Sequence, residues 1–176
     1  IIKRKKFDII IFDLGLSANQ INDPKRGFSF MKEGPLDMDM GGSKIRASDI
    51  INNFSERKLA DIFFELGEER YAKRIARNIV KQRKIELINN TKKLSELIKE
   101  SIPKINSKKI KINPATKTFQ ALRIYVNDEL NELKTALSKS SQLLNKEGKL
   151  IVVSFQSLED RIVKDFFNHN SGKRWR

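Results

Sequence analysis

FDIIIF, at residues 7–12, is a continuous apolar run rich in β-branched side chains. Such a run is typical of a strand that is buried on both faces, as strands of parallel sheets usually are. A second run of this kind, GKLIVVSF at residues 148–155, begins at a glycine turn. We therefore predict two strands of one parallel sheet, joined by a right-handed crossover connection.

The chain between these strands has mostly helical patterns. SERKLADIFFELG, at residues 55–67, predicts a helix with Ser55 as its N-cap and Gly67 as its stop signal. A second helix is expected over residues 68–84, with acidic residues in its first turn and basic residues in its last. A third is expected over about residues 91–101.

A basic connector, NSKKIKI at residues 106–112, precedes the last helical segment, residues 113–144. Asn113 is the candidate N-cap of this segment, and Pro114 suits the first helical position. Apolar residues keep helical spacing along nearly all of it. The pattern predicts one long helix of about eight turns with one apolar face.

Charge separates the middle of the chain from the rest. Residues 40–112 hold 18 Lys and Arg against 9 Asp and Glu, a net charge of +9 out of +14 for the whole chain. We predict that they form an inserted, basic, helical subdomain. Residues 1–39 and 113–176 would form the α/β domain that this insert interrupts.

Composition narrows the function classes. The net charge of +14 favours a polyanionic partner, nucleic acid before an anionic membrane, although a genome bias toward Lys, Ile and Asn is an alternative cause. Because the chain has no cysteine, disulfides, thiolate zinc sites and a cysteine nucleophile are excluded. His169 is the only histidine, so we expect no histidine-based triad, no multi-histidine metal site and no metal. No apolar run reaches the roughly 18 residues of a membrane span, so we expect a cytoplasmic protein without membrane contact.

A long loop with polar residues follows the first strand. Ligands of open α/β sheets bind outside the carboxyl ends of the strands, where Asp13 is expected. Gly15 allows close approach of the backbone to a ligand, and Gln20 can donate and accept hydrogen bonds. Alternatively, Asp13 caps the next helix and Gly15 serves a tight turn. The apolar residues of this loop, which runs to residue 40, indicate an ordered segment that builds a site.

A second polar cluster, SFQSLEDR at residues 154–161, follows the second strand. Ser154 and Gln156 are candidates for lining the same crevice as Asp13. Alternatively, Ser157 is a helix N-cap with Asp160 at the third helical position, close to a capping box. The two interpretations are compatible, because the start of a capped helix also offers N–H donors.

Basic residues recur at spacings of three and four within the second predicted helix, so they share one of its faces. A single basic stripe is normally a solvated helix face. Here the surrounding block is also basic, which favours phosphate contacts whose affinity falls with salt. The stripe consists of Arg70, Lys73, Arg74, Arg77, Lys81 and Lys84.

Five ordered strings resemble the MraW family (ribosomal RNA small subunit methyltransferase H), and the resemblance covers nearly the whole chain. It implies a doubly wound, Rossmann-like, S-adenosylmethionine-dependent methyltransferase with an inserted helical domain. It also implies N4-methylation of a cytidine in the decoding region of 16S rRNA, and hence the small ribosomal subunit as partner. Asp13 and Gln20 match cofactor contacts of the family. The strings are DLGLSANQ, RGFSFMKEGPLDMDM, GEERYAKRIARNIV, NPATKTFQALRIYVNDEL and SFQSLEDRIVK.

The chain departs from the family pattern in two respects. The family's N-terminal segment, with a Gly-rich cofactor loop, and its C-terminal tail are missing, so we expect a fragment that is inactive by itself. In addition, Gln156 stands where the family usually has His. Hydrogen bonding or rRNA contact, and not proton transfer, is therefore expected at this position.

Two other functions stay open at this point. One is a non-catalytic RNA-binding or ribosome-assembly module that uses the same basic surface. The other is a related methyltransferase that acts on organellar rRNA. A nucleotide hydrolase is not expected, because the chain has no G-x-x-x-x-G-K-[ST] loop. The sequence does not fix the oligomeric state, and a homodimer is one option.

Overall fold

The computed structural model describes residues 6–103 and 113–171 and divides into two compact units. The sheet unit contains Ile1–Leu16 and Asp128–Arg176, and the helical unit contains Ser17–Asn127. The helical unit is therefore larger than the predicted insert, residues 40–112. That this insert is a functional subdomain of its own stays a prediction, and the basic connector at its end lies outside the described residues.

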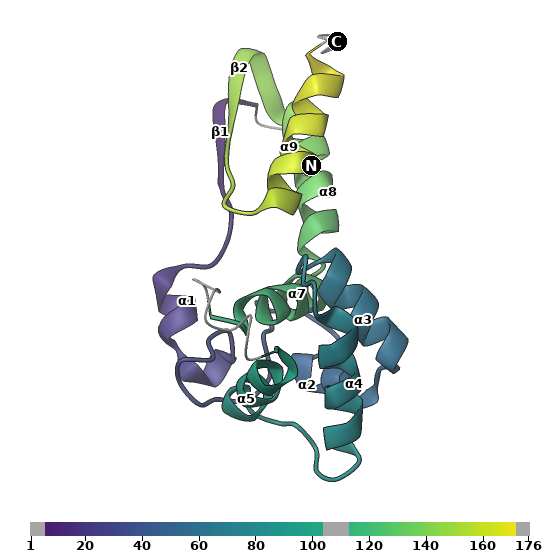
Figure 1. Cartoon of the computed structure of the whole chain (residues 1–176). Coiled ribbons are helices and arrows are strands. Elements are labelled where there is room, and N and C mark those ends of the chain that lie inside the picture. The colour runs from purple at the N-terminus through teal and green to yellow at the C-terminus, as the bar shows by residue number, and fades with distance from the viewer. Residues whose placement is uncertain (1–5, 104–112, 172–176) are drawn as a thin grey trace. The chain divides into compact units, whose positions relative to one another are not determined.

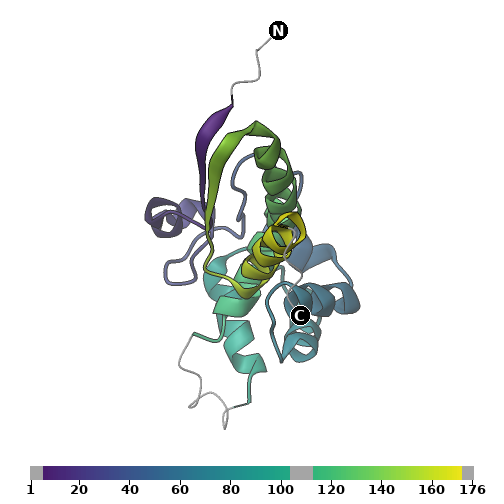
Figure 2. The same ribbon diagram turned by 90° about the horizontal axis from the view of Figure 1, so that it is seen from above.

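The sheet unit contains two strands and two helices. β1 (Phe7–Asp13) pairs in parallel with β2 (Leu144–Val153). In both ribbon views α8 (Glu129–Leu143) and α9 (Ser157–Asn170) lie on one face of this pair (Figures 1 and 2). The prediction of a parallel sheet in an α/β fold is confirmed, although β2 begins and ends earlier than the predicted residues 148–155.

The core of the sheet unit lies between the strand pair and the two helices. Leu133 and Leu137 of α8 and Val163 of α9 are buried there. Alternate side chains of a strand point to opposite faces of a sheet, so every second strand residue reaches this core. The residues at or next to the strands that do so are Phe12, Leu14, Leu150 and Val152.

The opposite face of the strand pair is exposed, so the prediction that both strands are buried on both faces is wrong. Ile11, in the middle part of β1, is 62% exposed. The cause is that α8 and α9 cover one face only, which leaves the intervening strand residues without a covering layer among the described residues. These residues are Phe7, Ile9, Ile11, Ile151 and Val153.

The helical unit is built from short helices around one apolar core, to which Phe63, Ile75, Leu94 and Leu122 contribute fully buried side chains. Within the described residues, no helix has the length and apolar character to cross a bilayer. In chain order the elements are α1 (Ala18–Asn22), η1 (Pro24–Arg26), α2 (Ala47–Asn53), α3 (Glu56–Glu65), α4 (Ala72–Arg83), α5 (Thr91–Ser101) and α7 (Thr116–Asn127).

Helix caps account for several of these boundaries. The Ser55 hydroxyl accepts a hydrogen bond from the Lys58 amide at 3.2 Å, which confirms Ser55 as the N-cap of α3. Asn90 caps α5 in the same way, with its Oδ1 2.8 Å from the Lys93 amide. A cap of this kind typically stabilises a helix by about 1 kcal/mol.

The end of α3 differs in detail from its prediction. The left-handed residue after the helix is Glu68, with φ 50°, and not Gly67. Gly67 instead allows close packing, because a Cβ there would lie 2.5 Å from the Lys117 carbonyl oxygen of α7. The turn around Glu68 also explains why α4 begins at Ala72 and not at residue 68.

The single long helix predicted over residues 113–144 is wrong. The segment forms α7 and α8, separated at Asp128, whose backbone is left-handed with φ 49° and ψ 35°. The Asn131 and Glu132 amides donate to the Asp128 carbonyl at 3.1 and 3.0 Å and so start the second helix. The Asn113 side chain does accept from the Ala115 amide at 3.0 Å, but the helix begins only at Thr116.

Candidate functional site

The carboxyl ends of β1 and β2 lie side by side in the sheet unit. Asp13 pairs with Val153 in the parallel register, and the Leu14 amide donates to the Val153 carbonyl at 3.0 Å. Ser154 follows Val153 directly, so the two polar segments singled out in the sequence leave the sheet at one edge. Asp13 itself is exposed there. The predicted adjacency is confirmed, and the chemical roles of Asp13 and Ser154 stay predictions.

Gly15 gives this edge an open stretch of backbone. Its φ of +107° is one that residues other than glycine rarely adopt. A Cβ built on Gly15 would have no heavy atom within 4 Å. The glycine is therefore required by backbone conformation and not by packing inside the protein. Its open side allows another molecule to approach the main chain.

Gln20 closes the first turn of α1. Its Oε1 accepts from the Ser17 amide at 2.9 Å, and the Ser17 hydroxyl accepts from the Gln20 amide at 3.2 Å. These two bonds form a capping box. Gln20 belongs to the helical unit, whereas Asp13 and Gly15 belong to the sheet unit, so a shared role in cofactor binding stays a prediction.

α9 begins one residue earlier than the alternative interpretation proposed. Gln156 is its N-cap residue and Ser157 is its first helical residue, so the prediction of Ser157 as the N-cap is wrong. The cause lies in the backbone: Gln156 is extended, with φ −122° and ψ 143°, and its carbonyl accepts the first helical hydrogen bond from the Asp160 amide at 2.9 Å. The Gln156 side chain makes no capping bond.

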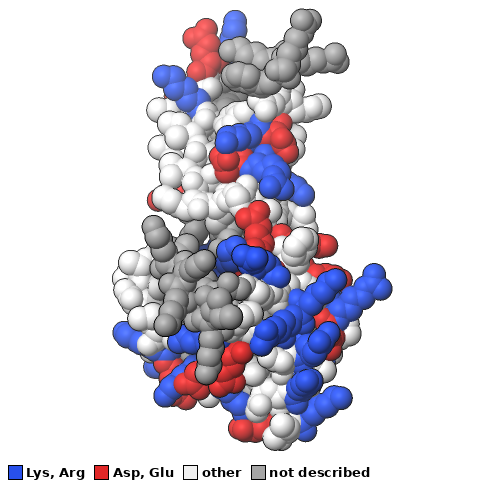
Figure 3. Space-filling model, in the orientation of Figure 1, with Lys and Arg blue, Asp and Glu red and all other residues white. Residues whose placement is uncertain are grey.

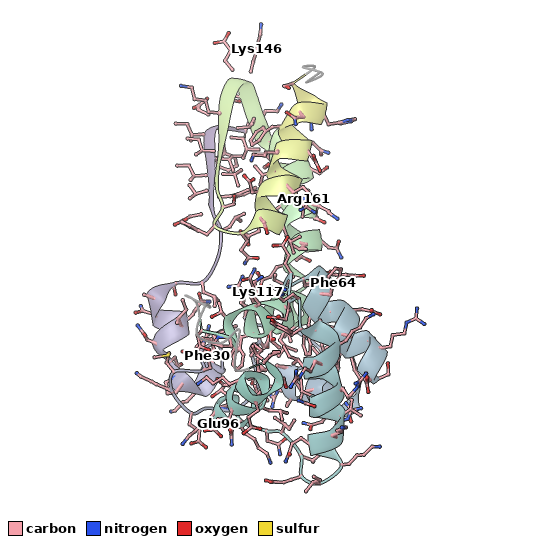
Figure 4. All side chains as sticks on the ribbon, in the orientation of Figure 1. Phe30, Phe64, Glu96, Lys117, Lys146 and Arg161 are labelled. Atoms are coloured by element: carbon pink, nitrogen blue, oxygen red, sulfur yellow. The ribbon has the colours of Figure 1, made fainter. Side chains whose placement is uncertain are left out.

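The first turn of α9 carries two acidic side chains, Glu159 and Asp160. Glu159 is buried, whereas Asp160 is partly exposed and forms an ion pair with Lys164 at 2.6 Å. Two acidic residues at a helix N-terminus interact favourably with the helix dipole. Arg161, the residue after this first turn, is exposed (Figure 4). The start of α9 therefore presents a cation to solvent, seven residues after Ser154.

The long loop after α1 is packed into the helical unit. Thr91, at the start of α5, accepts from the Gly34 amide at 3.0 Å and donates to the Lys32 carbonyl at 2.9 Å through its hydroxyl group. A Cβ on Gly34 would lie 1.9 Å from the Pro24 carbonyl oxygen, so the loop folds closely on itself. Its order is confirmed; that it builds a site stays a prediction.

Asp39 organises the end of this loop and was not singled out in the sequence. Its Oδ1 accepts from the Gly41 amide at 2.8 Å and from the Ser43 amide at 3.0 Å. These bonds stabilise the charged form and hold the pKa of the Asp39 carboxyl below its ordinary value of 3.8. A clue was present in the sequence, since residues 39–43, DMGGS, combine Asp, Gly and Ser, which are residue types typical of turns.

The basic stripe is exposed on the surface of the helical unit. Lys73, Arg74, Arg77 and Lys81 lie on α4, Arg70 precedes the helix, and Lys84 follows it. Figure 3 shows basic side chains gathered along the side of the helical unit where α4 runs. The predicted common face is confirmed for the four residues on α4, whereas Arg70 and Lys84 flank the helix. Contact of the stripe with RNA stays a prediction.

Two members of the stripe have partners of their own. Arg77 Nε lies 3.5 Å from Glu56 Oε1, and the Arg70 guanidinium lies 5.3 Å from the centre of the Tyr71 ring. Both contacts are at the surface, where such interactions contribute little to stability. The stripe is thus available to a phosphate backbone at little structural cost.

Comparison with known proteins decides the family. A family model described as the MraW methylase family matches residues 2–174. The chain belongs to the MraW methylase family. MraW methylases are S-adenosylmethionine-dependent enzymes with a Rossmann-like fold, and the parallel β1–β2 pair with its flanking helices agrees with that fold.

Curated relatives of this chain come from several Rickettsia species. It is 52% identical to a ribosomal RNA small subunit methyltransferase H of Rickettsia canadensis over 172 residues, which are 98% of this chain and 55% of that protein. Proteins of the same name from Rickettsia massiliae and Rickettsia bellii are 51% and 49% identical over the same shares. The chain thus spans about half the length of the relatives that it matches.

The helical unit also contains a cavity that the sequence did not suggest. It has a volume of about 140 Å³ and opens between the start of α4 and the start of α7. Its polar lining includes Glu69 and Lys117; the Lys117 ammonium donates to the Glu68 carbonyl at 2.9 Å.

Among the described residues, no cluster of three or more His, Asp or Glu side chains could hold a metal ion.

Proposed function

We propose that this protein, in its whole length, transfers a methyl group from S-adenosylmethionine to the exocyclic N4 of a cytidine in the decoding region of 16S rRNA. Membership of the MraW methylase family supports the reaction class, and the name of the Rickettsia relatives supports the small-subunit rRNA as substrate. The observation that carries the proposal is the parallel pairing that brings Asp13 and Ser154 to one edge of the sheet.

The chemistry at this edge is compatible with the cofactor. Asp13 offers an exposed carboxylate that accepts hydrogen bonds from amine or hydroxyl groups, and Gly15 offers open backbone. S-adenosylmethionine, when bound, supplies an electrophilic methyl group. Asp13 and Gly15 would hold the cofactor from the sheet unit. For Gln20, a contact with the cofactor rests on the match to the family's motif alone.

The residues past β2 would orient the acceptor base. Methyl transfer to an amine requires alignment more than a strong base, and positioning alone can lower a barrier by about 7–11 kcal/mol in favourable cases. Asp13, Ser154 and Gln156 are the groups that we assign to this positioning. The amide of Gln156 does not titrate near neutral pH, so it donates and accepts hydrogen bonds and takes up no proton.

RNA binding would come from the basic stripe and from shape. The target base has to leave any stack to reach a methyl donor, as in other base-modifying enzymes. Cations on α4 would meanwhile contact phosphates of the rRNA, which are the groups that proteins use to position a structured RNA.

The decisive experiment compares two aspartates of the same strand in the whole protein. Asp13→Ala is expected to weaken S-adenosylmethionine binding, measured by calorimetry, by at least about tenfold, the effect of losing one or two hydrogen bonds to a charged group. Asp8→Ala is the control, because Asp8 lies at the opposite end of β1 and bonds to Asn145. Equal affinity of both variants would refute the assignment of Asp13.

A non-catalytic RNA-binding or ribosome-assembly module is the alternative. The exposed basic stripe supports it, since that surface does not depend on the sheet edge. The same calorimetry separates the two functions: a whole protein that binds 16S rRNA and shows no affinity for S-adenosylmethionine would be a module of this kind.

A further inference from the structure

Two apolar side chains stand exposed in the loop between α4 and α5. Ile85 is 82% exposed and Leu87 is 55% exposed. They lie two residues apart, directly after the basic stripe, whose last member is Lys84. We call these two residues the apolar tip. Single exposed apolar residues are common on protein surfaces, so the tip requires further support before a function is assigned to it.

The first support is that the loop is held rigidly. The Ile85 and Glu86 amides both donate to the Gln82 carbonyl, at 2.9 and 3.0 Å. On the other side of the tip, Asn52 of α2 pairs with the Ile88 backbone through its amide group, in two bonds of 3.0 Å. The tip is thus fixed between two anchors, and the exposure of its side chains is a feature of the folded loop.

Additional contacts strengthen the same loop. Lys93 of α5 donates to the Leu87 carbonyl at 3.3 Å and forms an ion pair with Glu86. Arg83 donates to the Ile51 carbonyl at 2.8 Å. Ile88, the next apolar residue, is fully buried. Ile88 therefore packs into the core and stabilises the fold, whereas Ile85 and Leu87 project into solvent.

The second support is the charge around the tip. Between residues 70 and 93 the chain has nine Lys or Arg and a single acidic residue, Glu86. That acidic residue is the one paired with Lys93. A polyanion is the partner that such a surface attracts. The apolar tip lies at the end of a cationic helix face. A partner that suits both features has phosphates and apolar surface.

We propose that the apolar tip packs against an unstacked base of the RNA while α4 contacts its phosphates. Single-stranded loops and bulges of RNA present bases that are free to contact side chains, whereas the bases of a continuous duplex are stacked. The inference rests on the RNA binding of the proposed function and names the second element of that interface. A rigid loop suits this task, because little conformational freedom is lost on binding.

The test uses the whole protein and protein-free 16S rRNA transcript. The double variant Ile85→Ser, Leu87→Ser is expected to bind about tenfold more weakly, which corresponds to losing the burial of part of two aliphatic side chains. The slope of log affinity against log salt concentration should stay unchanged, since no phosphate contact is removed. A flattened slope would mean that the variant disturbs the basic stripe, and would overturn the proposal.

Two controls make the outcome specific. Phe64→Ser removes another exposed apolar side chain, 65% exposed near the end of α3, and should leave RNA affinity unchanged. A fully paired RNA duplex should bind the tip variant and the parent protein equally, because it offers no unstacked base. An equal loss on both RNAs would overturn the proposal.

Other outcomes separate this inference from the proposed function. If the tip variant binds the transcript as tightly as the parent but loses affinity for whole small subunits, the tip contacts a ribosomal protein and the proposal is wrong. If the tip variant binds normally throughout while Arg74→Gln weakens binding, the inference fails and RNA binding by the stripe stands. Unchanged urea unfolding of the tip variant would confirm that it is folded, as the exposure of both residues predicts.

Discussion

Asn127 joins the end of α7 to the backbone on both sides of Asp39. Its Nδ2 donates to the Met38 carbonyl and its Oδ1 accepts from the Met40 amide, at 2.8 Å in each case. Met38 is fully buried and has a φ of 62°, a conformation that is unfavourable for a residue other than glycine. The side chain of Asn127 thus stabilises a strained part of the loop within the helical unit.

Asn127→Ala is expected to destabilise the helical unit by about 2–4 kcal/mol. It removes both contacts with the loop and the bond to the Arg123 carbonyl, and it leaves partly buried backbone groups unpaired. Urea unfolding followed by circular dichroism measures the change. Asn131→Ala is the control, because its single bond to Asp128 is exposed and its loss should cost less than about 0.5 kcal/mol. Equal effects of the two variants would contradict this role of Asn127.

Thr91 and Thr118 form a second matched pair. Both are fully buried, but Thr91 makes two hydrogen bonds with the long loop, whereas Thr118 Oγ1 has no partner among the described residues. The isosteric change Thr91→Val should therefore cost about 2–3 kcal/mol of unfolding free energy. Thr118→Val should be neutral or stabilising by up to about 1 kcal/mol, because it removes a buried unsatisfied hydroxyl. The same urea titration checks both, and a destabilised Thr118→Val would point to a water or other partner at that hydroxyl.

The break at Asp128 shows where periodicity stops being informative. Phe119, Leu122 and Val126 keep helical spacing with Leu133 and Leu137, so the sequence gives a continuous stripe. In the structure the first three are buried in the helical unit, and the last two are buried in the core of the sheet unit. Helical spacing indicates which residues are buried, but it does not indicate which part of the protein they pack against. The local signal was the pair Asn127 and Asp128, two residue types that tolerate left-handed backbone.

The part of the candidate site that depends on the two strands was predictable from the sequence. Two apolar runs and the parallel pairing rule placed Asp13 and Ser154 at one edge, and the register confirms it. The N-cap at Gln156 could not be predicted in this way, because Ser157 has the stronger intrinsic preference for a cap. The backbone leaving β2 is extended through Gln156, and this geometry determines the start of α9.

Asp39 makes the stability of the loop depend on pH. Because its pKa in the folded protein is below the ordinary value of 3.8, the carboxylate stabilises the folded state above about pH 4, and this contribution is lost as the pH falls through the folded pKa. The parent protein should therefore be more stable than Asp39→Asn at pH 5, with the difference shrinking toward pH 2.5. Urea midpoints of both proteins at intervals across this range measure it. A difference that grows on acidification would show the sign to be wrong.

Neutralising the stripe on α4 should change the salt dependence of RNA binding. Arg74→Gln and Lys81→Gln are the cleanest probes, because both side chains are exposed and Arg77 is already close to Glu56. Each lost phosphate contact should reduce the slope of log affinity against log salt by roughly 0.7–0.9, and affinity should fall most at low salt. Filter binding with 16S rRNA transcript between about 50 and 200 mM salt spans the useful range. Lys139→Gln, an exposed change on α8 in the sheet unit, should leave the slope as it is. If all three variants lower the slope equally, the attraction comes from the net charge of +14 and not from α4.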